Sequence, residues 1–161
     1  MPALNPDYVR IVASATNQCP YFTLLNMKLL DFDIGSSLIE IDLGDRHLQP
    51  FGVVHGGVFS SIIDAAAFWC VYPEVPENSG LTTVDLKLNY LAPASSGKLV
   101  ARGHRIKLGK TLGLGEAEVT DETGRILAHG TSTLIVLPDF PFVHGEPLPR
   151  KFEDDHRETI Y

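Results

Sequence analysis

The stretch that decides the fold is QPFGVVHGGVFSSIIDAAAFWC, which runs from Gln49 to Cys70. It predicts one long apolar helix, roughly His55 to Val71, with a histidine and two glycines at its start. The only charged residue in the stretch is Asp64, in the middle of the helix. A carboxylate is costly to bury, so its place on an otherwise uncharged helix requires either solvent, a partner or a function.

The two faces of this helix differ in an unusual way. At about 100° per residue, one broad apolar stripe forms and should face a sheet: Val58, Phe59, Ile62, Ile63, Ala66, Trp69 and Cys70. Asp64 lies nearly opposite the centre of this stripe. Around it are small residues and a phenylalanine instead of the Lys, Glu and Arg of a wet surface: Gly57, Ser60, Ser61, Ala67, Phe68 and Val71. A helix without a polar face is usually covered on both sides, and a second subunit is the simplest second cover.

The rest of the chain predicts strands around this helix. Its 161 residues favour one domain. A short helix is expected at Pro6–Thr16, and two strands are expected within Tyr21–Gly44, joined at Ile34-Gly35-Ser36. Four further strands are expected after the long helix: Leu81–Leu91, Lys98–Leu108, Thr111–Thr120 and Arg125–Leu137. This order predicts an α+β fold in which an antiparallel sheet wraps around one long central helix.

The character of the sequence changes at Pro138. The last segment, 138–161, has four prolines and dense charge without periodicity. We therefore expect a folded domain over residues 1–137 and a C-terminal tail over 138–161, either free or lying as an arm on a partner subunit.

Composition excludes several classes of function. The net charge of −7 argues against a nucleic-acid partner. No apolar run is long enough for a membrane span, and the N-terminus lacks the pattern of a signal peptide, so a cytoplasmic location is expected. Two cysteines and six histidines without ligand spacing predict no metal site. From Leu86 to Gly115, however, there is no Asp or Glu among six basic residues, which is either a solvated surface or a landing site for an anionic molecule.

The start of the long helix supplies a chemical reason for Asp64. Gly56 and Gly57 lie in the first turn, where backbone N–H groups lack helical partners and the helix dipole favours negative charge. Such groups can form an oxyanion hole for acyl transfer. Gly56 and Asp64 are about 12 Å apart along a helix axis, too far to share one carbonyl group. Two helices packed antiparallel about a two-fold axis would bring the glycine of one subunit to the carboxylate of the other.

Three segments resemble a known family. The segment GVVHGGVFSSIIDAAA is similar to the HGG-x6-D signature of hotdog-fold acyl-CoA thioesterases, in the phenylacetate-pathway and 4-hydroxybenzoyl-CoA thioesterase group. The later segments TTVDLKLNYLAPA and LGKTLGLGEAEV also resemble that group. The resemblance extends roughly from Leu25 to Leu137, and it implies the hotdog fold, in which subunits pair into a continuous sheet.

The resemblance also implies a set of catalytic residues. The Gly56 N–H would polarise the thioester carbonyl, and His55 would shape the turn that carries it. Gln49 would orient substrate or water, and Asp64 would be the catalytic carboxylate, acting as nucleophile or as general base. Thr83 matches a position that helps place the attacking water, although strand alternation puts it on the face opposite Val84 and Leu86.

The substrate implied by the resemblance is an acyl-CoA. Coenzyme A then enters as part of the substrate, and no separate cofactor is expected. The substrate-binding residues would be the second glycine of the helix start and the KLGKT segment of the acid-free region: Gly57, Lys107, Gly109, Lys110 and Thr111. The expected assembly is a homodimer, or a homotetramer built as a dimer of dimers, with neither nucleic acid nor membrane as partner.

Two other functions stay open at this stage. One is a non-catalytic acyl-CoA binding or sensing domain, in which Asp64 would be a costly residue for a passive pocket. The other is a hotdog hydratase or dehydratase, although the approach QPFGVVHGG does not resemble the histidine-bearing segment of that group. Release of a free thiol from acyl-CoA would separate hydrolysis from both.

Overall fold

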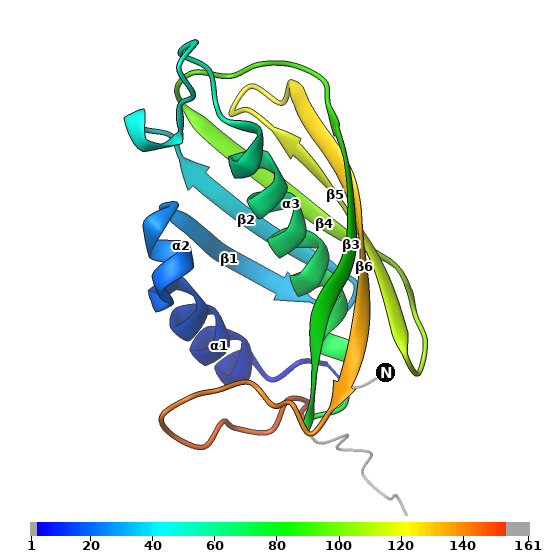
Figure 1. Ribbon diagram of the computed structural model, residues 1–161. Helices are drawn as coiled ribbons and strands as arrows, with labels where there is room; N and C mark the ends of the chain where they lie inside the picture. Colours follow the sequence, from blue (N-terminus) through cyan, green and yellow to red (C-terminus); the bar gives the residue numbers. More distant parts are fainter. Residues whose placement is uncertain (1–2, 154–161) are drawn as a thin grey trace, which may run out of the picture.

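The structure, a computed structural model that describes residues 3–153, has one long helix lying across a curved antiparallel sheet (Figure 1). The helix is α3 (Gly56–Val71), and the short 3-10 helices η1 (Asp45–His47) and η2 (Tyr72–Glu74) lie before and after it. The sheet has the order β1-β2-β4-β5-β6-β3. Its strands are β1 (Met27–Asp33), β2 (Ser36–Asp42), β3 (Ser79–Tyr90), β4 (Lys98–Leu108), β5 (Leu112–Thr120) and β6 (Ile126–Pro138). This is the hotdog arrangement expected from the sequence.

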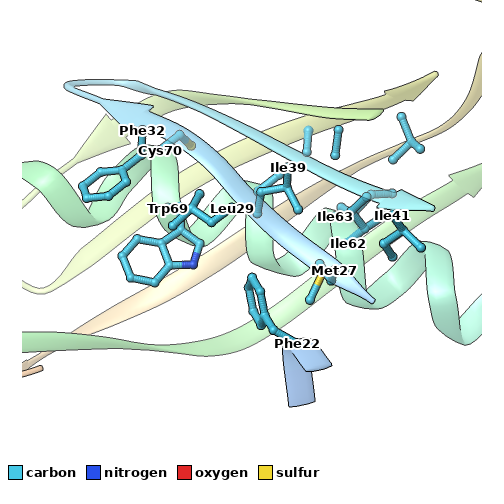
Figure 2. Packing of buried hydrophobic residues seen from close by; sticks show 14 of the residues in the cluster. Phe22, Met27, Leu29, Phe32, Ile39, Ile41, Ile62, Ile63, Trp69 and Cys70 are labelled. Atoms are coloured by element: carbon cyan, nitrogen blue, oxygen red, sulfur yellow. The ribbon is translucent and has the colours of Figure 1, made fainter. Parts of the chain in front are cut away.

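The predicted apolar stripe of α3 is the core of the protein. All seven of its residues are buried, and Figure 2 shows Ile62, Ile63 and Trp69 packed near Met27, Leu29 and Phe32 of β1. Two residues expected on the Asp64 face, Ala67 and Val71, are buried as well. These two residues are covered by strand β5 of the same chain, which approaches Ala67 at Gly115 and Val71 at Gly113, and not by a second subunit.

Glycines in the sheet allow this close wrapping. A Cβ atom on Gly115 would lie 2.5 Å from the Ala67 carbonyl oxygen, and one on Gly113 would lie 2.7 Å from Val71 Cγ1. A Cβ on Gly103 would collide with the carbonyl of Ala66. Larger residues at these positions would push the sheet off the helix, so the fold needs glycine there for space.

Two helices precede the sheet, where the sequence predicted one helix and an early strand. The first, α1 (Pro6–Gln18), matches the expected helix and extends two residues further. The expected strand start at Tyr21 was wrong, because residues Pro20–Leu24 form the short helix α2. Pro20 at the first helical position fixes the backbone for a helix, which explains the difference.

Helix α1 closes one edge of the sheet. The Asn17 side-chain amide donates to the Leu29 carbonyl at 3.0 Å, and its oxygen accepts from the Leu29 N–H at 2.7 Å. Asn17 therefore replaces a neighbouring strand at this point of β1. No strand of the described chain pairs with the outer side of β3, so the opposite edge is open.

The four later strands lie within two residues of their predicted bounds. The pairing of β3 with β6 is interrupted by a bulge, in which Thr83 faces Leu134, Asp85 faces Thr133 and Val84 is the extra residue. A bulge reverses the alternation of the strand, so Thr83 and Leu86 can both point toward the helix. The expectation that they lie on opposite faces was therefore wrong.

Residues 139–153, which we call the C-terminal strap, fold back on their own chain beneath α1 (Figure 1). The Asn5 N–H donates to the Lys151 carbonyl at 2.9 Å, and the Glu153 N–H donates to the Ala3 carbonyl at 3.0 Å. The described part of the expected tail therefore covers the subunit that carries it, whereas residues 154–161 lie outside the described residues.

A buried lysine anchors the strap. Lys151 is only 2% exposed, and its Nζ donates to the carbonyls of Tyr72 at 2.9 Å and Val75 at 2.7 Å. It also lies 4.4 Å from the centre of the Tyr72 ring. Burial lowers the pKa of Lys151 from 10.5 to about 8, although the Glu77 carboxylate acts in the opposite direction.

This pKa predicts how stability depends on pH. In the unfolded chain Lys151 has its ordinary pKa near 10.5, so between pH 8 and 10.5 the unfolded chain binds more protons than the folded chain. The contribution of Lys151 to the stability of the folded chain is therefore fully present above pH 10.5. It is lost as the pH falls from 10.5 through about 8. Compared with Lys151→Met, the wild type should gain about 2 to 3 kcal/mol of unfolding free energy between pH 7.5 and 10.5 in denaturant titrations.

The control for this experiment is Lys28→Met, which changes an exposed lysine of β1. It should show no comparable pH-dependent difference from the wild type. A difference between wild type and Lys151→Met that stays flat across the same pH range would contradict the assignment.

Candidate active site

A buried histidine builds the loop that leads into α3. His47 Nδ1 accepts from the Gly44 N–H at 2.9 Å, and its Nε2 lies 2.7 Å from the Leu25 carbonyl oxygen. The neutral ring therefore carries its proton on Nε2. The His47 carbonyl in turn accepts from the His55 N–H at 2.8 Å, so one histidine connects the helix start to the segment between α2 and β1.

The helix start presents one free backbone donor. His55 is the N-cap residue, and its Nδ1 accepts from the Gly57 N–H at 2.8 Å. The Gly57 N–H is thus used by the cap, whereas the Gly56 N–H has no acceptor among residues 3–153. Tyr90 closes over this turn, with its hydroxyl donating to the Gly56 carbonyl at 3.3 Å.

Gln49 lies in the same loop, but its side chain is engaged locally. Its Oε1 accepts from the Phe51 N–H at 2.7 Å, and its own N–H donates to the Val53 carbonyl at 2.8 Å. The amide nitrogen of the side chain has no acceptor within the described residues. Gln49 can therefore offer a donor to a ligand without breaking the loop.

Two hydroxyl groups hold the Asp64 carboxylate by one oxygen. Thr83 Oγ1 donates to Asp64 Oδ1 at 2.7 Å, and Ser132 Oγ donates to the same atom at 3.2 Å. The bulge at Val84 turns Thr83 toward the helix, and Ser132, on the neighbouring strand β6, is fully buried. Both donors use Oδ1, and the second oxygen, Oδ2, has no hydrogen-bond donor among the described residues.

Asp64 lies on the wall of a cleft of about 360 Å³ between α2, α3 and β3. The cleft has a hydroxyl end and an aromatic end, and its lining includes Tyr21, Ser60, Ser61, Leu86, Phe68 and Trp69. Ser61 donates its proton to the Gly57 carbonyl at 2.7 Å, so Tyr21 is the donor in the 2.7 Å bond between their hydroxyl groups. This bond fixes α2 beside the carboxylate, and it was not foreseen because α2 was expected to be a strand.

The basic segment lies at the other end of the helix. Lys107 is the last residue but one of β4, and Lys110 lies in the tight turn to β5; both side chains are exposed. The Gly109 N–H donates to the Leu112 carbonyl at 2.8 Å, and the Thr111 carbonyl accepts from the Val136 N–H at 2.8 Å. Gly113 next to this turn contacts Val71, the last residue of α3. Within one chain, the turn is therefore about 22 Å along the helix from Gly56.

Two other basic residues of the acid-free region form ion pairs. Lys98 Nζ lies 2.9 Å from Glu40 Oε1, and Arg105 forms an ion pair with Glu74. The expected site residues thus form three groups: the helix start with Gln49, His55 and Gly56, the Asp64–Thr83 pair in the cleft, and the basic turn. One chain alone brings no two of these groups together.

Other kinds of site are not found in the part of the chain that the structure describes. Residues 3–153 contain no cluster of three His, Cys, Asp or Glu side chains that could hold a metal ion. No helix among them is long and apolar enough to cross a membrane. The hydroxyl-held carboxylate and the free N–H at the helix start are therefore the chemical features of this region that require an explanation.

Similarity to known proteins identifies the family of the chain. Residues 51–128 match the thioesterase superfamily. Acyl-coenzyme A thioesterase 13 of Homo sapiens is 30% identical over 104 residues, which span 62% of this chain and 71% of the human protein. The chain belongs to the thioesterase superfamily.

Other relatives of this thioesterase support the same family assignment. The 1,4-dihydroxy-2-naphthoyl-CoA hydrolase of Listeria monocytogenes is 24% identical over 112 residues, or 70% of this chain and 91% of that protein. A thioesterase family protein from Silicibacter pomeroyi has the same fold, with a TM-score of 0.74 at 24% identity over 81% of this chain and 98% of that one. The family resemblance and the hotdog fold are confirmed, and the protein is a thioester hydrolase. This membership favours hydrolysis over the hydratase and the non-catalytic binding domain.

The hydroxyl groups on Asp64 lead to a testable expectation. Thr83→Val keeps the shape of the side chain but removes a hydrogen bond to a charged group, so turnover of a thioester substrate should fall about tenfold. Ser132→Ala should reduce turnover in the same direction. Thr83→Ser keeps the hydroxyl and is the matched control, which should stay within about threefold of wild type. If turnover falls equally in Thr83→Ser and Thr83→Val, the hydrogen bond from the Thr83 hydroxyl to Asp64 does not support turnover.

Proposed function

We propose that the protein hydrolyses acyl-CoA or aryl-CoA thioesters at a site formed by two subunits. The observation that carries this proposal is the Asp64 carboxylate, held on Oδ1 by two hydroxyls and bordering a largely apolar cleft. A structural carboxylate would not need an open oxygen beside a cavity of this kind. The human relative is named as an acyl-coenzyme A thioesterase and the Listeria relative as a CoA hydrolase, which supports a coenzyme A thioester as the substrate class.

In the proposed reaction, the thioester carbonyl oxygen accepts a hydrogen bond from the Gly56 N–H of one subunit. This donor stabilises the negative charge that develops on the oxygen as the carbonyl carbon becomes tetrahedral. Asp64 of the other subunit then acts through Oδ2 in one of two ways. It either removes a proton from water, which attacks the carbonyl carbon, or attacks that carbon itself to form an acyl-enzyme anhydride that water hydrolyses. In both cases the C–S bond breaks and coenzyme A leaves as the thiolate.

The two edges of the sheet support the proposed dimer. The β1 edge is closed by Asn17 and α1, whereas the β3 edge is open and carries exposed apolar side chains, including Val84 and Tyr90. Pairing β3 with its copy about a two-fold axis would join two sheets into one and place the two α3 helices antiparallel. Tetramer formation and the cytoplasmic location remain predictions from the sequence alone.

An antiparallel pair also gives the basic turn a role in the proposal. In one chain the Lys107–Lys110 turn lies at the C-terminal end of α3, far from Gly56. In the proposed dimer, the C-terminal end of one helix approaches the start of the other. Lys107 and Lys110 of one subunit would then meet the phosphates of a coenzyme A whose thioester lies at Gly56 of the other.

The first test is Asp64→Asn, which keeps the size of the side chain and removes the base or nucleophile. Turnover of acyl-CoA substrates, followed by release of free thiol, should fall by ~10²–10⁴-fold or more. Asp31→Asn, at an exposed position of β1, is the control and should retain activity. Near-normal turnover by a correctly folded Asp64→Asn protein would assign Asp64 a structural role only.

The second test asks whether the site is shared between subunits. Gly56→Pro deletes the N–H, and proline is well accepted at the first position of a helix. Its ring would meet the Tyr90 hydroxyl, which belongs to an exposed side chain that can move. When inactive Gly56→Pro and Asp64→Asn subunits are mixed, one site of each mixed dimer carries both defects and the other carries neither.

After subunit exchange, the mixed dimer should therefore show about half the wild-type rate per dimer, provided that its two sites work independently. The control is each variant exchanged with itself, which should stay inactive. If heterodimers form and fold but no activity returns, both groups belong to a site within one chain.

A further inference from the structure

The far end of the cleft is made by aromatic side chains that depend on one another. Phe68 and Trp69 line it, with ring centres 5.3 Å apart at 69°. Tyr72 stacks on Phe68 at 5.8 Å and 14°, and meets Trp69 edge-on at 5.2 Å. Phe32 of β1 contacts Trp69 from another side at 5.3 Å. The position of each lining ring is thus set by rings that do not face the cleft.

The C-terminal strap supports this cluster from behind. Phe142 of the strap packs edge-on against Trp69, with ring centres 6.4 Å apart. Lys151 of the strap lies over the Tyr72 ring and donates to the Tyr72 carbonyl at 2.9 Å. Two separate contacts therefore lead from the strap to the cleft, one through Trp69 and one through Tyr72 to Phe68.

A charged lysine in this position indicates a role in positioning. Tyr72 receives the Lys151 cation over its ring, a hydrogen bond on its carbonyl and a 3.3 Å bond from the Tyr8 hydroxyl. The Glu77 carboxylate lies close by and accepts from the backbone N–H of Lys151 at 3.3 Å. A leucine could fill this space at a lower cost of burial, but it would not fix the Tyr72 ring by its charge.

From these contacts we infer that the strap sets the depth of the acyl-binding cleft, with Phe142 and Lys151 as positioning residues. The inference rests on the proposed function, because it identifies the cleft as the site of the acyl group. Phe142 holds Trp69, and Lys151 holds Tyr72 against Phe68, so the end wall cannot retreat to admit a longer group. The strap therefore restricts the enzyme to acyl groups that end at this wall.

The direct test is Phe142→Ala, measured over a series of linear acyl-CoA substrates from butyryl to dodecanoyl. Removing the ring leaves space behind Trp69, so the wall can move back and the cleft can deepen. The ratio of kcat/KM for decanoyl-CoA to that for butyryl-CoA should rise about tenfold, because one or two methylenes in an apolar pocket are worth that much. The change should lie in KM for the long substrate, with kcat for butyryl-CoA within about twofold of wild type.

Val143→Ala is the matched control. Val143 is the next residue of the strap but is 92% exposed, so its truncation leaves no space behind the cleft. Its length profile should equal that of wild type. A general loss of stability would lower the rates for all substrates together, whereas a moved wall changes only their ratio.

A binding measurement separates this inference from the proposed function. Trp69 is the only tryptophan in the sequence, so intrinsic fluorescence reports on the end wall. Alkyl-CoA thioethers have no carbonyl to hydrolyse, and their dissociation constants follow from the change in Trp69 emission. The preference for decyl over butyl thioether should rise about tenfold in Phe142→Ala, and in the same direction in Lys151→Met.

The outcomes are distinct. Hydrolysis by all variants with an unchanged length profile would overturn the role of the strap and leave the thioesterase proposal standing. Thioether binding with the expected shift, but no hydrolysis of any acyl-CoA by wild type, would overturn the proposed function and support the strap. Failure of wild type to bind either thioether would overturn the inference. If Lys151→Met fails to fold, Phe142→Ala still decides the question.

Discussion

The close approach of α3 to the sheet is the constraint on which the rest of the structure depends. It requires glycine at positions 103, 113 and 115, because a Cβ atom there would press on the helix backbone or on Val71. The contact is made specific by the Ser37 hydroxyl, which donates to the Ala66 carbonyl at 2.7 Å. Because this packing buries most of the helix, one half-buried face remains, which includes Ser61 and Phe68. That face carries Asp64, so the packing that makes the core also determines where the carboxylate is presented.

Local sequence patterns were sufficient for the elements but not for the contacts between them. The apolar stripe predicted α3 and its burial, and strand alternation predicted the bounds of the last four strands to within two residues. Ser132 was missed as a partner of Asp64, because 68 residues separate them and nothing near either one signals the pairing. Thr83 was expected on the wrong face because the bulge at Val84 depends on the partner strand β6. Register and bulges are set by pairing, which a single strand does not encode.

The difference between local patterns and tertiary contacts also explains why the segments near the two ends of the chain were predicted incorrectly. Pro20 carries the signal for α2, but the apolar run that follows is equally suited to a strand. Tertiary contacts give that segment its place, including the burial of Phe22 and the bond from Tyr21 to Ser61. Proline and charge made the C-terminal segment resemble a tail. In the structure the segment is held on its own chain by Lys151. The charged side chain of Lys151 is buried, where two backbone carbonyls accept its hydrogen bonds and an aromatic ring lies beside it. A lysine in a sequence predicts an exposed side chain. Its burial as an anchor depends on tertiary contacts, which the local sequence does not show.

The asymmetry of the sheet edges connects these features to catalysis. One chain holds a donor at Gly56 and a carboxylate at Asp64, but on a single rigid helix their separation of about 12 Å is fixed. No movement of loops can shorten it, so a one-chain site would need a different donor or a different base. The closed β1 edge and the open β3 edge leave one side of the sheet for a second copy. In the proposed dimer, pairing there would replace the fixed distance along one helix by an adjustable distance between two helices, and only the latter could match the length of a thioester carbonyl.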